Sequence, residues 1–183
     1  MSLPHALLTA LVERASSGSE LASRFDRSIG YFWHATHQQI YRELARLEAS
    51  GFIEGLSEEE AARGRKRDYR ILPAGRAELK RWIRQEAEPA TLREEFLVRL
   101  RAEAAVGPTG LDKELRRRIA LHEEKLAQYQ RIEARDFPTE PQDREAALQH
   151  LVLRVGIHYE ENWLGILKEA LAALAKPKRS AKP

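Results

Sequence analysis

The sequence of 183 residues contains no cysteine and no long hydrophobic run. Without cysteine the chain can form neither disulfide bonds nor metal sites built from thiolates. No apolar stretch approaches the roughly 20 residues that a membrane-spanning helix requires. The N-terminal stretch MSLPHALL lacks the basic segment and the cleavage site of a signal peptide. We therefore expect a cytoplasmic protein with no membrane partner.

The short motifs of the common enzyme classes are also missing. The sequence contains no nucleophile elbow, no glycine-rich phosphate loop and no zinc-protease motif. His34 and His37 lie three residues apart, but no acidic residue beside them completes a set of metal ligands. We therefore predict no catalytic residues, no metal and no cofactor.

The charges are nearly balanced, with 31 Lys and Arg against 28 Asp and Glu and a net charge of +3. Hydrophobic residues make up 43% of the chain, which is enough for a core. A net charge this small does not itself indicate a nucleic-acid partner. Any binding to DNA must therefore depend on a local basic patch.

The first half of the chain carries the signals of a winged helix-turn-helix. A first helix is predicted to end before residues 16–18, with apolar residues at helical spacing: Leu7, Leu8, Leu11 and Val12. Ser17 and Glu20 then match a capping box that opens a second helix. Its buried stripe is expected to contain Leu21, Phe25 and Ile29, and Gly30 is expected to end it.

Thr36 and Gln39 match a second capping box, which opens a third helix. Ile40, Leu44 and Leu47 are spaced four and three residues apart and must face the core. Gly51 is expected to end this helix in a left-handed conformation.

Two short strands are predicted next, at 52–53 and 69–71, and the loop between them, residues 56–67, resembles a wing. Pro73 opens a fourth helix, with Leu79, Trp82 and Ile83 on one face.

The second half is predicted to be helical, after Pro89 breaks the fourth helix. One helix is marked by an apolar stripe of Leu92, Phe96, Leu100 and Ala104. Two longer helices are marked by stripes at 111–129 and 148–174, and a turn at 137–141 joins these two into an antiparallel hairpin. We therefore predict a mainly α fold: an N-terminal winged helix-turn-helix in residues 1–88, an α-helical dimerisation domain in 89–175 and a disordered basic tail in 176–183.

The apolar stripes of the hairpin are too broad for the two helices to cover each other, which favours a homodimer. The alternative is a monomer whose long helices fold back on its own winged domain. The residues expected at the dimer interface are Leu111, Leu115, Leu126, Leu148, Val152, Val155, Trp163 and Ile166.

Opposite its buried stripe, the third helix presents side chains suited to the major groove of double-stranded DNA. Gln pairs with adenine and Arg with guanine or phosphate, while Ala permits a close approach, here at Ala45. The wing adds basic residues that can grip phosphates. The candidate DNA-binding residues are Thr36, His37, Gln38, Gln39, Tyr41, Arg42 and Arg46 in the helix, and Arg65, Lys66 and Arg67 in the wing. Both segments can also be read as ordinary solvated surfaces, the wing because Glu58, Glu59 and Glu60 offset its charge.

Two aromatic groups admit a ligand-binding interpretation beside a structural one. Residues 31–33, Tyr-Phe-Trp, either stack on a base or ligand or, as we favour, pack the second helix against the third. Tyr159 and Trp163, beside His158 and Glu161, either line a pocket for a small aromatic effector or, as we favour, pack in the dimer core.

Taken together, these segments resemble the PadR family of bacterial transcriptional regulators. The matching segments are 5–33, 37–54, 64–79 and 93–100, and the helical second half is similar in architecture more than in sequence. Lys66 and Pro73 depart from the family pattern, which usually has Pro and Thr at these positions. The resemblance implies a dimeric repressor that binds a palindromic operator and releases it when a small molecule binds, in some members a phenolic acid. It extends the DNA role to Gln38, Tyr41 and Arg42.

Two other functions fit the same pattern. Winged helices also serve as protein-interaction adaptors that do not touch nucleic acid. The chain could also sequester a small molecule without any effect on DNA.

Overall fold

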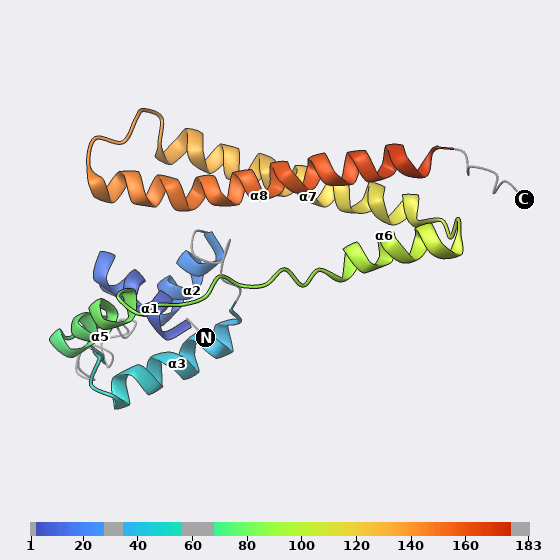
Figure 1. Ribbon diagram of the computed structural model, residues 1–183. Helices are drawn as coiled ribbons and strands as arrows, with labels where there is room; N and C mark the ends of the chain where they lie inside the picture. Colours follow the sequence, from blue (N-terminus) through green and yellow to red (C-terminus); the bar gives the residue numbers. More distant parts are fainter. Residues whose placement is uncertain (1–2, 28–34, 56–67, 177–183) are drawn as a thin grey trace, which may run out of the picture. The chain divides into compact units, whose positions relative to one another are not determined.

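The computed structural model describes residues 3–27, 35–55 and 68–176, and the chain divides into two compact units, Met1–Pro89 and Ala90–Pro183 (Figure 1). We call these the N-terminal unit and the C-terminal unit. The N-terminal unit contains α1 (Leu3–Glu13), β1 (Ser16–Ser17), α2 (Gly18–Arg27), α3 (His37–Ala49), β2 (Ile53–Gly55), β3 (Asp68–Ile71) and α5 (Pro73–Ile83). The C-terminal unit contains α6 (Glu95–Val106), α7 (Leu111–Asp136) and α8 (Arg144–Leu174).

The three short strands form one antiparallel sheet in the order β1-β3-β2. Ser16 pairs with Tyr69, and Ile53 pairs with Ile71. The strands β2 and β3 lie where the sequence predicts them, within a residue or two. The strand β1 was not predicted, because two serines carry no alternation of apolar and polar residues.

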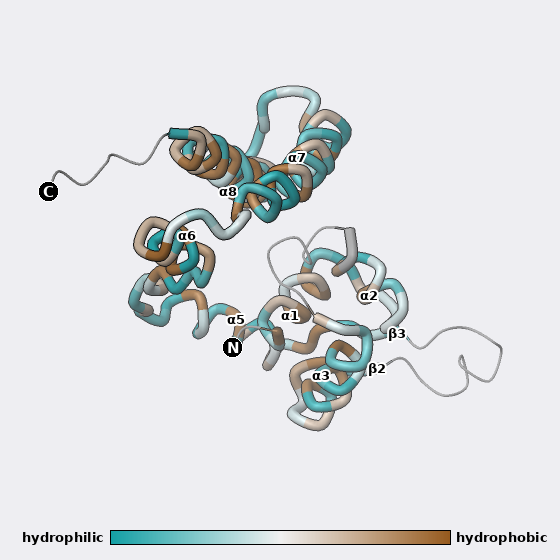
Figure 2. Tube along the Cα trace, turned by 90° about the vertical axis from the view of Figure 1, so that its right-hand side faces the viewer, coloured by the Kyte–Doolittle hydropathy of each residue, from teal (hydrophilic) through white to brown (hydrophobic). Residues whose placement is uncertain are grey.

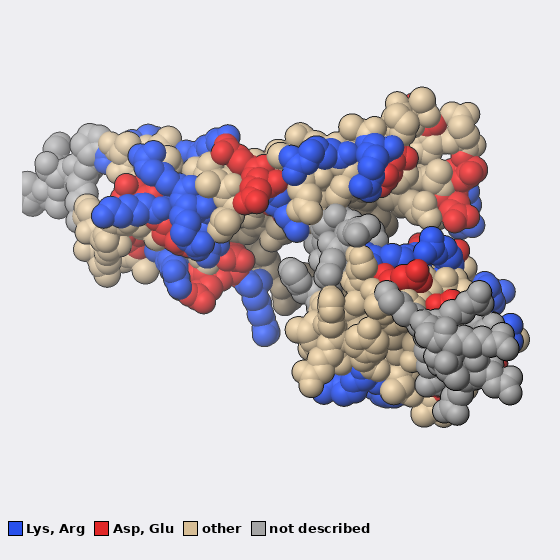
Figure 3. Space-filling view, turned by 180° about the vertical axis from the view of Figure 1, so that it is seen from behind, with Lys and Arg blue, Asp and Glu red and all other residues tan. Residues whose placement is uncertain are grey.

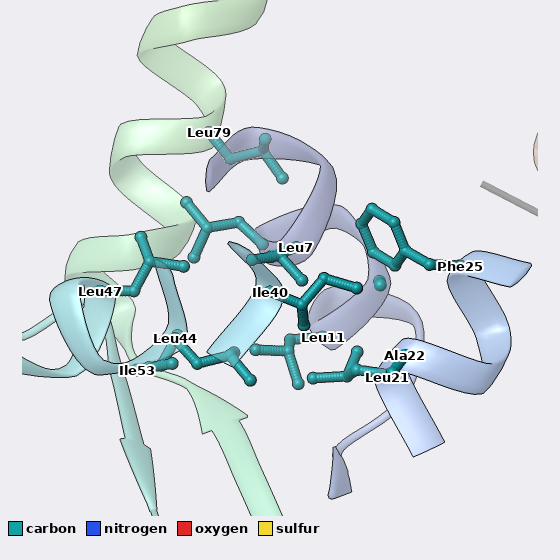
Figure 4. Packing of buried hydrophobic residues seen from close by; sticks show 12 residues of the cluster. Leu7, Leu11, Leu21, Ala22, Phe25, Ile40, Leu44, Leu47, Ile53 and Leu79 are labelled. Carbon is teal, nitrogen blue, oxygen red and sulfur yellow. The ribbon is translucent and has the colours of Figure 1, made fainter. Parts of the chain in front are cut away.

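The core of the N-terminal unit confirms the predicted buried stripe of α3 and most of those of α1 and α2, whereas Val12 at the end of the first stripe is 37% exposed. Side chains from α1, α2, α3 and β2 point toward one another, and Leu79 of α5 lies at the edge of the cluster (Figure 4). Ile40 and Leu44 are fully buried, and Leu47 is nearly so. Burial of each such side chain contributes about 1.5–3 kcal/mol. The other members are Leu7, Leu8, Ala10, Leu11, Leu21, Ala22, Phe25 and Ile53.

A polar contact joins α1 to α5 beside this core. The imidazole of His5 stacks on Trp82, with ring centroids 4.3 Å apart, and its Nε2 lies 3.2 Å from Glu78 Oε1. Glu78 also accepts two hydrogen bonds from Arg81, at 2.6 and 2.7 Å. The Arg81 guanidinium, with His5 second, lowers the pKa of Glu78 to about 2. This carboxylate therefore keeps its charge well into acid solution.

One predicted side chain of α5 is placed differently. Ile83 is 68% exposed, so the prediction that it shares the buried face with Leu79 and Trp82 is wrong. Ile83 is the last residue of α5, where the helix has run past the core. Ile29 and Gly30, the aromatic residues 31–33, the wing 56–67 and the tail from residue 177 lie outside the described residues.

In the C-terminal unit, α7 and α8 form the predicted antiparallel hairpin (Figure 1). A second apolar cluster has Phe96, Leu115, Trp163 and Leu167 at its centre. The predicted stripe from residue 92 is wrong at both ends, because Leu92 and Ala104 are exposed. Leu92 precedes the first turn of α6, so it cannot lie on the buried face of that helix.

The turn between α6 and α7 is held by a buried carboxylate. Glu103 accepts a hydrogen bond of 2.9 Å from the backbone N–H of Thr109 and a second one from the Thr109 hydroxyl. Both donors belong to Thr109 in the turn. These two hydrogen bonds explain how a carboxylate is tolerated at a buried position.

Hydrophobic and hydrophilic residues alternate along the long helices (Figure 2). Among the described residues, no helix combines the length and the hydrophobicity that crossing a membrane requires.

The same substitution at two helical glycines should have opposite effects on stability. A Cβ atom at Gly75 would lie 2.3 Å from the carbonyl oxygen of Phe52 and 2.9 Å from Ile71 Cγ1, whereas one at Gly165 would meet no atom within 4 Å. We expect Gly75→Ala to lower the free energy of unfolding by about 1–3 kcal/mol through overpacking. Gly165→Ala should raise it by about 0.5–1 kcal/mol through helix propensity. Urea denaturation followed by circular dichroism measures both, and an unchanged Gly75→Ala protein would contradict the close packing.

Candidate nucleic-acid interface

A capping box fixes the start of α3, as the sequence predicts. The Thr36 hydroxyl accepts a hydrogen bond of 3.2 Å from the backbone N–H of Gln39. The side-chain oxygen of Gln39 accepts one of 2.8 Å from the backbone N–H of Thr36. Gly51, with a φ of 69°, follows the other end in the expected left-handed conformation. The bounds of the helix are therefore set by local contacts.

The buried stripe of α3 determines which of its residues face outward. The predicted face is exposed, at Gln38, Tyr41, Arg42 and Ala45. Beside it, the Arg46 side chain is 78% exposed and lies 3.8 Å from Glu43. Within the described part of the chain, no carboxylate pairs with Arg42. The face therefore combines an amide, a phenol and a guanidinium.

The capping box divides the predicted DNA-binding residues of α3 into two groups. The side chains of Thr36 and Gln39 are engaged in the cap, and His37 is exposed in the first turn. The functional groups of Gln38 and Arg42 are presented one turn apart on the outward face. An amide and a guanidinium at this spacing can pair with base edges in a major groove. The predicted wing residues Arg65, Lys66 and Arg67 lie outside the described residues.

The charges of the C-terminal unit are mixed in sign. Over the C-terminal unit, Lys and Arg lie next to Asp and Glu (Figure 3). Many of them pair within one helix, such as Arg99 with Glu95 at 2.5 Å and Arg117 with Glu114 at 2.7 Å. Arg117, followed by Arg118, lowers the pKa of Glu114 to about 2. Exposed pairs of this kind add little stability, and they cancel much of the local field.

The α8 helix carries an exposed apolar stripe. Its members recur every three or four residues and therefore share one face of the helix. Their exposed fractions range from 49% to 64%. We call its four aliphatic members the α8 stripe: Leu148, Leu151, Val152 and Val155. Tyr159 continues the same face one turn further on.

The residues predicted at a dimer interface are placed unevenly relative to this stripe. Leu148, Val152 and Val155 belong to it, and Leu126 is half-buried on α7. The remaining four belong to the chain's own apolar cluster: Leu111, Leu115, Trp163 and Ile166. Leu115 and Trp163 are buried within the single chain, which leaves them little surface for a second copy.

The two predicted effector-binding residues lie together on α8. The rings of Tyr159 and Trp163 meet edge to face, with centroids 6.4 Å apart. Trp163 is 8% exposed and also stacks on His122 of α7, so Tyr159 offers most of the accessible ring surface.

Sequence reasoning missed the polar contact beside these rings. His122 Nδ1 lies 2.5 Å from Glu160 Oε2, and Glu160 is buried. The signal was a histidine in the otherwise apolar seam of α7. Its partner is 38 residues away, so periodicity does not identify it. In the described part of the chain, no group of three or more His, Cys, Asp or Glu is placed to hold a metal ion.

The chain matches a different family model in each half. Residues 7–81 match the PadR-like family of transcriptional regulators, and residues 92–175 match the C-terminal region described as virulence activator alpha. The probable transcriptional regulator Rv1176c of Mycobacterium tuberculosis is 41% identical over 185 residues, covering 93% of this chain and 98% of that protein. The negative transcriptional regulator PadR of Bacillus subtilis is 29% identical, covering 95% of this chain and 98% of that protein.

Solved structures resemble this chain over nearly its whole length. The virulence activator AphA of Vibrio cholerae has a TM-score of 0.80 at 33% identity, covering 94% of this chain and 98% of that one. Bacillus subtilis PadR in complex with operator DNA has a TM-score of 0.78 at 25% identity, covering 95% and 99%. The same protein in complex with p-coumaric acid has a TM-score of 0.79 at 25% identity, covering 96% and 100%.

Proposed function

We propose that this chain, which belongs to the PadR-like family of transcriptional regulators, is a cytoplasmic repressor that binds a palindromic operator as a homodimer. The family resemblance inferred from the sequence is confirmed by these matches, and the relatives are transcriptional regulators. Bacillus subtilis PadR is a negative regulator with a structure on operator DNA, which supports a DNA partner and a repressor role here.

The exposed face of α3 carries the proposal. Gln38 and Arg42 lie one turn apart on the surface that the core leaves outward. In our proposal, Gln38 pairs with a base edge in the major groove, and Arg42 pairs with guanine or a phosphate. Arg46 and the wing residues Arg65, Lys66 and Arg67 add contacts to the phosphates. Thr36 and Gln39 hold the start of the helix that delivers these groups.

The second part of the proposal is the homodimer, and the α8 stripe is its interface. Four large aliphatic side chains, each exposed by about half or more, share one face of a long helix. A second copy of the chain covers this face by packing the same stripe against it, as expected for a symmetric dimer. Two α3 helices then enter successive major grooves about 34–36 Å apart.

The third part is release by a small aromatic effector. Bacillus subtilis PadR has been solved with p-coumaric acid, an aromatic acid. Tyr159, an exposed ring beside Trp163, is the residue of this chain that we assign to such a ligand. Binding changes DNA affinity only if the ligand prefers one arrangement of the two α3 helices over another.

Removing the outward side chains of α3 should weaken binding to the preferred duplex without unfolding the protein. A duplex selected by the wild-type chain from a random-sequence pool serves as the probe, with an unrelated duplex as competitor. Gln38→Ala and Arg42→Ala should each weaken binding by about 1–3 kcal/mol, or roughly 5- to 150-fold, measured by fluorescence anisotropy. Gln130→Ala and Arg131→Ala, exposed on α7, are the matched controls and should bind like the wild type. If the pool yields no preferred duplex, the adaptor function is favoured instead.

A charge within the α8 stripe should separate the dimer. Light scattering coupled to size exclusion should give twice the chain mass of 21.0 kDa for the wild type and a single chain mass for Val155→Glu. Burying an unpaired carboxylate in an apolar interface is unfavourable. Ala172→Glu, exposed near the C-terminal end of α8 and beyond the stripe, adds the same charge and should remain dimeric. A dimeric Val155→Glu protein would rule out this interface.

p-Coumaric acid should release the selected duplex from the wild-type chain, lowering its apparent affinity by about 5- to 150-fold. Cyclohexanecarboxylic acid, which lacks an aromatic ring, should have little effect. Tyr159→Ala should keep DNA binding and lose the response. Release of DNA from the Tyr159→Ala protein at the same concentration of p-coumaric acid would remove Tyr159 from the effector site.

A further inference from the structure

Gly18, the first residue of α2, lies directly against the ring of Tyr41 on α3. A Cβ atom at position 18 would lie 2.5 Å from Tyr41 Cε1, 3.2 Å from Cδ1 and 3.3 Å from Cζ. Gly18 is buried, whereas Tyr41 is 47% exposed. The phenol therefore rests on the backbone of α2 and keeps about half of its surface in solvent.

The backbone itself does not require glycine at this position. Gly18 is not among the glycines with positive φ, so its conformation is accessible to other residues. Alanine would also be favoured over glycine by helix propensity. The space occupied by the Tyr41 ring is the feature that excludes a side chain.

We propose that Gly18 is a positioning residue, which sets the orientation of Tyr41 so that its hydroxyl contacts the DNA backbone. This inference rests on the proposed function. A hydroxyl–oxygen hydrogen bond spans only about 2.5–3.0 Å, so a small rotation of the ring removes it. Contacts to the phosphates fix the register and orientation of a protein on the duplex. Tyr41 lies where α2 and α3 meet, so a contact made there constrains both helices of the motif.

The backbone at Gly18 is held more firmly than the phenol. The preceding residues Ser16 and Ser17 pair with β3, and Ser17 and Glu20 form the capping box of α2. Arg24 donates a hydrogen bond of 2.9 Å to the carbonyl oxygen of Ala10, which ties α2 to α1. Tyr41 is half-exposed, so solvent borders its ring on the side away from Gly18. A methyl group at position 18 therefore displaces the ring and leaves α2 in place.

The test is a double-mutant cycle in the full chain, using the duplex selected by the wild type. Gly18→Ala should weaken binding roughly tenfold, as expected for the loss of a hydrogen bond to a charged group. In the Tyr41→Ala background the same substitution should change affinity less than about twofold, because the ring it displaces is gone. Equal losses in both backgrounds would show that Gly18 acts through α2 alone and would overturn the inference.

A second measurement follows the exposure of the Tyr41 ring in the absence of DNA. Nitration by tetranitromethane, followed residue by residue with mass spectrometry, should be faster at Tyr41 in Gly18→Ala than in the wild type. Tyr129, which is 3% exposed, should be unchanged. An unchanged rate at Tyr41 overturns the inference, whatever the DNA result.

If the wild type selects a duplex and Gly18→Ala binds it equally, only the role of Gly18 fails. If the wild type selects none, the proposed function fails, and the DNA role of Gly18 fails with it.

Discussion

The burial of Ile40, Leu44 and Leu47 against the rest of the N-terminal unit is the constraint on which the candidate interface depends. Three aliphatic side chains on one face contribute about 1.5–3 kcal/mol each, and a cap contributes about 1 kcal/mol. Burial therefore sets the rotation of α3 about its axis, while the cap at Thr36 sets only where it begins. Since each residue adds about 100° of rotation, a shift of one position would turn Gln38 and Arg42 away from the outward face.

The parts of this fold that the sequence predicts are those that depend on neighbours in the chain. Both capping boxes join residues three apart, and the buried stripes recur within one helix. The failures depend on distant residues. The strand β1 exists only because β3, some 50 residues later, pairs with it. Ile83 and Leu92 are apolar, yet they lie where α5 ends and before α6 begins, so periodicity alone could not show that they miss the core.

The same polar contact occurs at three places where helices meet, and the periodicity of the sequence indicates none of them. In each case a histidine stacks on an aromatic ring and lies within hydrogen-bond distance of a glutamate. His5 does so with Trp82 and Glu78, His122 with Trp163 and Glu160, and His150 with Phe137 and Glu133. Apolar contact between helices is tolerant of sliding, whereas a hydrogen bond has a narrow range of distance and angle. These contacts therefore fix the register of α1 on α5 and of α7 on α8.

The two sides of α8 link the helical hairpin to the symmetry of the proposed operator. Ile157, Glu160 and Leu164 are buried, whereas the α8 stripe is exposed on the opposite side. Covering each exposed Å² of that stripe is worth about 25 cal/mol, and only a partner with a matching apolar face can do so along its length. A second copy has that face by definition, and pairing one face with itself generates a two-fold axis. In the proposed dimer the same axis relates the two α3 helices, so a protein that buries the α8 stripe in this way must read a DNA site with two-fold symmetry.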